Sequence, residues 1–77
     1  MDLGADNVVF CEDVLLVLDW TRAGSRPANR ELVGSARARD SLVEDKQGKK
    51  LSLVITKDKM YLLSASSARI RNKLDRT

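Results

Sequence analysis

Histidine is absent from this chain of 77 residues, and cysteine occurs once, as Cys11. A single cysteine cannot form a disulfide within the chain, and without histidine it cannot form a Cys/His zinc site. The absence of histidine also removes the side chain that most often acts as a general acid or base near neutral pH. The composition therefore predicts a protein that is not an enzyme, binds no small-molecule substrate and holds no metal ion or cofactor.

Aromatic residues are few, and the chain has no long apolar run. Phe10, Trp20 and Tyr61 are the only aromatics, whereas sequence-specific recognition of single-stranded RNA usually stacks bases on such side chains. The longest apolar run, VLLVL at residues 14–18, is far shorter than the roughly 20 residues that cross a bilayer. The N-terminal stretch is acidic and lacks the positive region of a signal peptide. We therefore expect a cytoplasmic protein without a membrane segment.

The chain is long enough for one small domain, which we assign to residues 1–77. On folding, a chain of this length hides only roughly 60% of the surface that its unfolded form exposes, so its stability margin is thin. Small domains often gain stability by oligomerisation.

The net charge is +3, and the charges are distributed unevenly along the chain. All lysines and arginines follow residue 20. The charged residues before that point are all acidic: Asp2, Asp6, Glu12, Asp13 and Asp19. This asymmetry predicts a folded surface with one basic face, which suits nucleic acid or an acidic partner. The alternative is an ordinary mixed surface whose charges only face solvent.

Residue patterns predict both strands and helices. Strands are favoured where β-branched, leucine and aromatic residues gather, at 7–10, 13–20, 41–45, 51–56 and 60–65. Helices are expected at 27–39, which starts with a proline, and at 66–76, where Ser66 or Ser67 is the cap. This order, with short turns between elements, favours an α+β fold with a small antiparallel, twisted sheet and two helices on one side or end.

Two apolar surfaces of these elements need partners. In the first helix, Ala28, Leu32 and Ala36 recur at helical spacing and form a thin stripe. The strand at 13–20 is apolar on both faces, because residues 14–18 do not alternate with polar ones. A domain this small has difficulty covering both faces, so a contact between subunits is the natural explanation. The predicted oligomer interface comprises Val14, Leu16, Leu18 and Trp20.

Lysines cluster in the connection at 46–50, which we predict to be the tip of a hairpin. Its QGKK stretch is not a P-loop, because Leu51 follows where a P-loop requires Ser or Thr. Lysines at such a tip can follow phosphates as compact charges without reading base edges. The predicted DNA-binding residues are Lys46, Lys49 and Lys50, with Arg37 of the first helix. The alternative is a tip whose charges only solubilise the protein.

Four motifs follow one another along the chain: LGADNVV, DVLLVLDW, SARARDSLVEDKQGKKLSLVI and YLLSASSARIRNKL. Their order and spacing resemble the small bacterial RemA/RemB family of extracellular matrix regulators, over nearly the whole chain. The resemblance implies a transcriptional regulator of matrix (biofilm) genes that binds double-stranded DNA. It also implies a fold related to LytTR-type DNA-binding domains and assembly into a ring-like homo-oligomer.

The resemblance extends to individual residues, with two departures. In the RemA branch a glycine is followed by two arginines that contact DNA, and the corresponding residues here are Gly48, Lys49 and Lys50. Lysine keeps the charge but lacks the guanidinium fork, so weaker or less specific binding is expected. Asp13 stands where that branch has another DNA-contacting arginine, and a carboxylate there would repel phosphate. The motifs at the start and end of the chain resemble the RemB branch more than the RemA branch. The alternative function is therefore a protein-interaction or assembly module that does not bind DNA.

Overall fold

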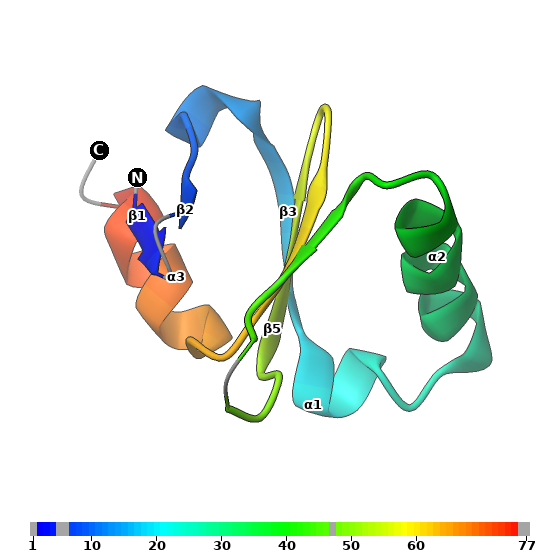
Figure 1. The fold of residues 1–77 in the computed structure, drawn as a ribbon. Coiled ribbons are helices and arrows are strands. Elements are labelled where there is room, and N and C mark those ends of the chain that lie inside the picture. The colour runs from blue at the N-terminus through cyan, green and yellow to red at the C-terminus, as the bar shows by residue number, and fades with distance from the viewer. Residues whose placement is uncertain (1, 5–6, 47, 76–77) are drawn as a thin grey trace.

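The computed structural model describes residues 2–4, 7–46 and 48–75, which form an α+β fold (Figure 1). Its elements in chain order are β1 (Asp2–Gly4), β2 (Asn7–Val8), the 3-10 turn η1 (Cys11–Asp13), β3 (Val14–Asp19), α1 (Trp20–Ala23), α2 (Pro27–Ala38), β4 (Leu42–Glu44), β5 (Ser52–Thr56), β6 (Met60–Leu63) and α3 (Ser67–Asp75). The short helix α1 was not anticipated from the sequence. The expected end of the last helix, at residue 76, lies outside the described residues.

A four-stranded sheet in the order β3–β5–β6–β4 forms the centre of the molecule. β5 pairs antiparallel with both β3 and β6, whereas β4 pairs parallel with β6. The prediction of an antiparallel sheet is therefore wrong, because the sheet is mixed. The cause is the connection through α2, which carries the chain from β3 at one edge to β4 at the other. A helical crossover of this kind returns the chain in its original direction.

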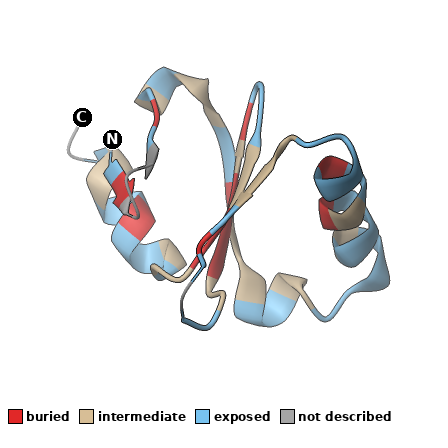
Figure 2. Cartoon of the chain, viewed as in Figure 1, coloured by how far each residue is buried: buried red, intermediate tan, exposed pale blue. Residues whose placement is uncertain are grey.

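The two longer helices lie on opposite faces of this sheet, so the molecule has three layers (Figure 1). The small two-stranded sheet of β1 and β2 lies on the same face as α3. The prediction that both helices lie on one side or end of the sheet is wrong, because α2 belongs to the crossover and α3 follows the last strand. Figure 2 shows that buried residues are concentrated in the central strands, with further ones in α2 and α3.

Each face of the sheet packs against its own hydrophobic cluster. The cluster on the α3 side comprises Leu3, Val9, Val17, Val54, Leu63 and Ile70. The cluster on the α2 side comprises Val33, Leu53 and Leu62. Leu53 and Val54 are neighbours in β5, so their side chains point to opposite faces, and both are completely buried. A single subunit therefore covers both faces of its central strands.

The buried face of α2 differs from the predicted stripe. Ala36 is completely buried, but Leu32 is 38% exposed and Val33 is the residue that packs against the sheet. The helix is rotated by about one residue relative to the pattern, because Val33 fits between Leu53 and Leu62. Leu32 consequently faces solvent as an isolated apolar side chain, which is common in soluble proteins.

Candidate nucleic-acid interface

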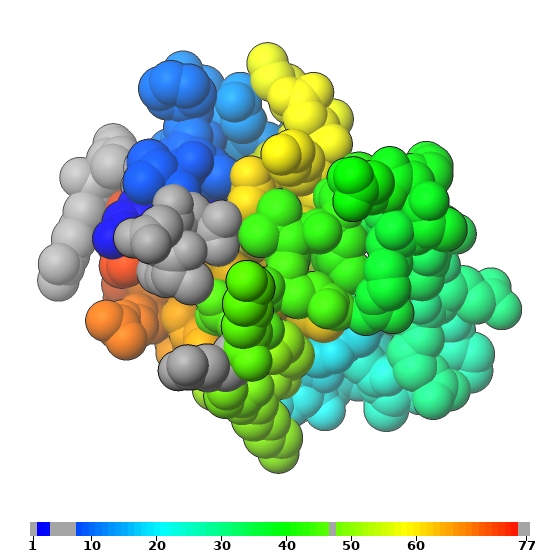
Figure 3. Space-filling view, viewed as in Figure 1, coloured from blue at the N-terminus to red at the C-terminus, as the bar shows by residue number. Residues whose placement is uncertain are grey.

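The strand directions bring three connections to one end of the sheet. β3, β4 and β6 run one way and β5 runs the other. Residues 20–26 after β3, the described residues 45, 46 and 48–51 between β4 and β5, and residues 64–66 after β6 therefore lie at the same end. A hydrogen bond from the Trp20 amide to the Leu51 carbonyl oxygen, 2.9 Å long, links the first two. In Figure 3 the yellow-green loop before β5 projects from the lower end, beside the cyan segment of α1.

Basic side chains gather at this end although they are up to 28 positions apart in sequence. We call the following group the cationic end: Arg22, Arg26, Lys46, Lys49 and Lys50. The opposite end of the sheet carries η1 and the turn between β5 and β6, where acidic and basic residues are mixed. Strand topology therefore brings five basic residues to one end of the sheet, which they share with the half-buried Asp19 and the buried Asp45.

The connection between β4 and β5, which carries Lys46, Lys49 and Lys50 and which we call the lysine loop, is not the hairpin tip that the sequence predicted. β6 lies between β4 and β5, so the loop has to cross the end of β6. The buried Asp45 anchors it there, because its Oδ2 accepts hydrogen bonds from the amide (2.9 Å) and the hydroxyl (2.8 Å) of Ser64. The lysines are thus carried by a crossover that is anchored to the sheet at its start.

The lysine side chains themselves are available to a ligand. Lys46 and Lys49 are exposed, and Lys50 is half-buried with its ammonium donating to the Gly48 carbonyl oxygen at 3.2 Å. The ion pairs between described residues, Arg37–Glu44 and Lys57–Asp13, involve none of the three. Their charges are therefore not neutralised by a salt bridge within the described part of the chain.

Gly48 sets the shape of this loop. Its φ is +81°, and a Cβ built on it would lie 3.2 Å from the Ser64 Cβ. We expect Gly48→Ala to destabilise the protein by about 1–2 kcal/mol, because an L-residue in the left-handed region carries that strain. Urea unfolding should show a lower midpoint at unchanged slope.

A matched control for this substitution is Gly34→Ala. A Cβ at Gly34, inside α2, would meet nothing within 4 Å. The added methyl group should stabilise the helix by about 0.5–1 kcal/mol. If the two substitutions changed stability in the same direction and by the same amount, the left-handed conformation assigned to Gly48 would be wrong.

Arg37, the fourth predicted DNA-binding residue, differs from the three lysines because it forms an ion pair. It belongs to the last turn of α2, and its guanidinium donates a hydrogen bond to the carboxylate of Glu44 at the end of β4. This ion pair offsets the positive charge that Arg37 would offer to a phosphate. Arg37 therefore joins α2 to the edge strand in the subunit, and Lys46, Lys49 and Lys50 remain the predicted residues that lie together.

Asp13, the acidic departure from the RemA pattern, is separated from the lysines. It immediately precedes β3, whereas the cationic end begins where β3 ends. The six residues of β3 span roughly 20 Å at about 3.3 Å per residue. Asp13 also pairs with Lys57, with 3.4 Å between Oδ1 and Nζ. Within one subunit, Asp13 therefore does not oppose phosphate binding at the cationic end.

The fold also brings Arg22 and Arg26, which follow β3, to the cationic end. Asp19 caps α1 by accepting hydrogen bonds from the Thr21 amide (3.1 Å) and hydroxyl (2.6 Å). The hydroxyl bond is the main reason that the pKa of Asp19 lies below its usual value, and the charge of Arg22 adds to the effect. Predicting this position requires the direction of the strands. Because β3 and β5 are antiparallel, the residues after β3 and the residues before β5 lie at the same end of the sheet.

The predicted oligomer interface is split by the fold. Val14 packs on the α3-side cluster, and Leu18 and Trp20 pack on the α2-side cluster, so these three contribute to the subunit's own core. Leu16 is 48% exposed, and its neighbour Leu15 is 66% exposed at a register shift in β3. Both leucines lie on an edge strand whose far side has no partner within the described sheet.

Part of that open edge is already occupied. The Trp20 amide donates to the Leu51 carbonyl oxygen and therefore points toward β5. Along a strand the backbone N–H and C=O groups of successive residues point to opposite sides. Val17, three positions earlier, therefore directs its carbonyl away from β5, toward the open edge. Arg71 of α3 donates a hydrogen bond to this carbonyl oxygen, with 3.0 Å between the atoms. A bound side chain of this kind prevents an added strand from pairing along the whole edge.

A scan against protein-family models finds no match, and no curated protein matches the chain. Within residues 2–4, 7–46 and 48–75, no three cysteine or acidic side chains gather where they could hold a metal ion. No helix in the described part of the chain is long and apolar enough to cross a membrane.

Proposed function

We propose that this chain is a DNA-binding transcriptional regulator of the RemA/RemB type, acting in the bacterial cytoplasm on extracellular matrix genes. The observation that carries the proposal is the convergence of Lys46, Lys49 and Lys50 with two arginines at one end of the sheet. The three lysines form no ion pair with a described residue, and unpaired basic groups favour a polyanion. The motif resemblance supports double-stranded DNA as that polyanion. It also supports a relation between this fold and LytTR-type DNA-binding domains.

The contacts expected from lysines are with the phosphate backbone. An ammonium group on a flexible stem binds phosphate as a point charge, whereas direct reading of guanine favours the arginine fork. Binding through Lys49 and Lys50 should therefore depend strongly on salt and weakly on sequence. The five residues of the cationic end correspond to a slope of about −4.5 in log K against log salt for each fully engaged subunit.

A salt titration of duplex binding tests the DNA proposal. Fluorescence anisotropy of a labelled duplex should give a slope of about −4 or steeper between 50 and 300 mM salt. A flat slope, or no binding at 50 mM salt, would reject DNA binding. The protein-interaction or assembly module would then be the better description, since the exposed Leu15 and Leu16 serve it equally well.

We further propose that the working form is a ring-like homo-oligomer. One subunit can neutralise only a few phosphates, and repeating its cationic end along a duplex multiplies the contacts. Leu15 and Leu16 on the edge strand supply an apolar contact for a second copy. Because Arg71 occupies the Val17 carbonyl, this contact uses side chains rather than a continuous sheet across subunits.

Light scattering tests the oligomer. The mass should be a multiple of the 8.6 kDa subunit, and Leu15→Ser/Leu16→Ser should shift it toward the monomer. Leu32→Ser is the matched control, because Leu32 is exposed on α2, away from the β3 edge. A parent protein that stays monomeric at all concentrations, or a control variant that dissociates equally, would contradict the proposed interface.

A further inference from the structure

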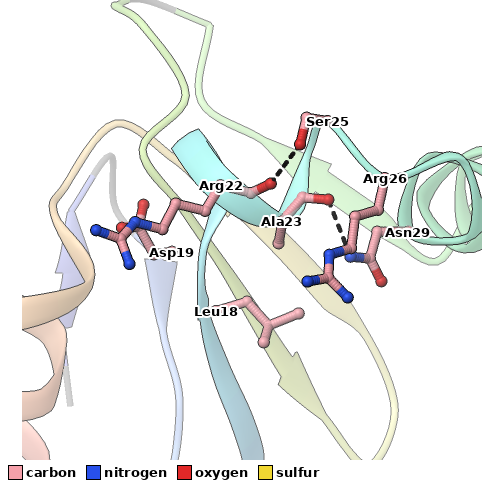
Figure 4. Close-up of a pocket in the computed structure, with 7 residues that line it drawn as sticks. All are labelled: Leu18, Asp19, Arg22, Ala23, Ser25, Arg26 and Asn29. Atoms are coloured by element: carbon pink, nitrogen blue, oxygen red, sulfur yellow. Dashed lines mark hydrogen bonds between the residues drawn. The ribbon is translucent and has the colours of Figure 1, made fainter.

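We propose that Arg22 and Arg26 form a second phosphate-binding position beside the lysine loop, so that each subunit grips duplex DNA at two places. This inference rests on the proposed DNA-binding function and extends it to residues outside the GKK motif. The two arginines flank a hollow of about 540 Å³ (Figure 4). Its lining residues are Leu18, Asp19, Arg22, Ala23, Ser25, Arg26 and Asn29.

The hollow and the lysine loop lie at the same end of the sheet. Trp20, two residues before Arg22, is hydrogen-bonded to Leu51, which follows Lys50. The end of the four-stranded sheet spans about 14 Å, that is three strand spacings of about 4.8 Å. Duplex DNA carries about eight phosphates over that length of its axis. One duplex therefore presents enough charge to meet both groups at once.

The backbone that carries the arginines is held firmly. The Gly24 amide donates to the Trp20 carbonyl oxygen at 2.9 Å, and the Ser25 hydroxyl donates to the Arg22 carbonyl oxygen at 2.8 Å. The Asn29 side-chain amide reaches back from α2 to the Ala23 carbonyl oxygen, also at 2.9 Å. A Cβ at Gly24 would lie 2.8 Å from the Trp20 ring, so glycine is required for this close turn. A preorganised turn loses less entropy when a ligand binds.

The two arginines differ in their surroundings. In Figure 4 the Arg22 guanidinium lies next to Asp19, whereas the Arg26 guanidinium extends beside Asn29. The Asp19 carboxylate offsets part of the Arg22 charge and repels a phosphate on that side. Arg26 directly precedes α2, whose N-terminus has no side-chain cap from this residue and adds a positive dipole. The phosphate position is therefore centred on Arg26, with Arg22 supporting it.

Arginine also supplies what the lysine loop lacks. A guanidinium binds phosphate through two parallel hydrogen bonds, which fixes orientation as well as adding energy. Lys49 and Lys50 provide flexible charge, and Arg26 provides a directed contact on a rigid turn. The pair of sites would thus set the orientation of the subunit on the duplex, although its GKK motif has no arginine.

The test is a salt titration of duplex binding by the 77-residue chain, by the single variant Arg26→Ala and by three double variants: Arg22→Ala/Arg26→Ala, Lys49→Ala/Lys50→Ala, and Arg39→Ala/Lys59→Ala. The last removes the same charge at the opposite end of the sheet, where both side chains are exposed. We expect Arg26→Ala alone to reduce the slope by about 0.9 and to weaken binding about eightfold at 0.1 M salt. Adding Arg22→Ala should weaken it further by a smaller factor.

The outcomes separate this inference from the function on which it rests. If the lysine variant loses slope while the arginine variant behaves like the Arg39/Lys59 control, the second phosphate position is wrong and the proposed function stands. If the parent itself does not bind duplex DNA, both are wrong. Should the alanine variant fail to fold by circular dichroism, Arg22→Gln/Arg26→Gln keeps the side-chain length, and the same slope reduction is expected.

Discussion

Replacing Lys49 and Lys50 with alanine is expected to weaken duplex binding about 60-fold at 0.1 M salt. Each lost phosphate contact removes about 0.9 from the slope of log K against log salt, and the curves of parent and variant converge near 1 M salt. Lys49 is exposed, and Lys50 contributes only a hydrogen bond to its own loop, so folding should be unaffected. Anisotropy titrations at several salt concentrations measure the affinity, and circular dichroism of both proteins checks the folding.

The Arg39→Ala/Lys59→Ala protein is the control for net charge. It loses two positive charges from the other end of the sheet, where screening by salt limits their influence on a duplex at the cationic end. Its affinity should stay within about twofold of the parent. Equal losses in both variants would mean that binding depends on net charge alone and that the cationic end has no special role.

Leu63→Ala is expected to have the largest effect on folding. Leu63 is completely buried in the α3-side cluster, and a buried leucine truncated to alanine costs about 2–5 kcal/mol. At about 0.05–0.15 kcal/mol per residue, a chain of 77 residues has about 4–12 kcal/mol of total stability. This single substitution should therefore remove a large part of it and leave a measurable unfolded fraction. Urea unfolding at fixed chain concentration gives the value.

Leu32→Ala is the matched control for that measurement. It removes the same atoms from a leucine that is 38% exposed on α2, so it should cost less than about 1 kcal/mol. A cost for Leu32→Ala equal to that for Leu63→Ala would contradict the assigned rotation of α2, in which Val33 rather than Leu32 packs against the sheet.

The sequence predicts the elements of this fold well and their arrangement less well. Strands at 13–20, 51–56 and 60–65 and both long helices are found close to their predicted positions. The hydrophobic pattern of a strand predicts which of its residues are buried, but it does not predict which other strand it pairs with. β4 is expected beside β5 and instead pairs parallel with β6. The chain crosses from one edge of the sheet to the other through α2, and no local pattern encodes that long-range pairing.

A local sequence pattern likewise identifies only part of the candidate site. The lysines of the GKK stretch are adjacent in sequence, so local reading finds them. Arg22 and Arg26 join them only through the antiparallel pairing of β3 with β5, which no local pattern encodes. The ion pair of Arg37 is equally hidden from local pattern, because its partner Glu44 is seven positions away on another element.

Lysine acetylation footprinting, with and without duplex DNA, tests the central claim most directly. It compares lysines within one chain and does not depend on the size of the assembly. The cationic end contains Lys46, Lys49 and Lys50, and the rest of the described surface contains Lys57, Lys59 and Lys73. DNA should protect the first three from modification and leave the other three unchanged. Protection of Lys57 and Lys59 instead, or equal protection of all six, would contradict the account.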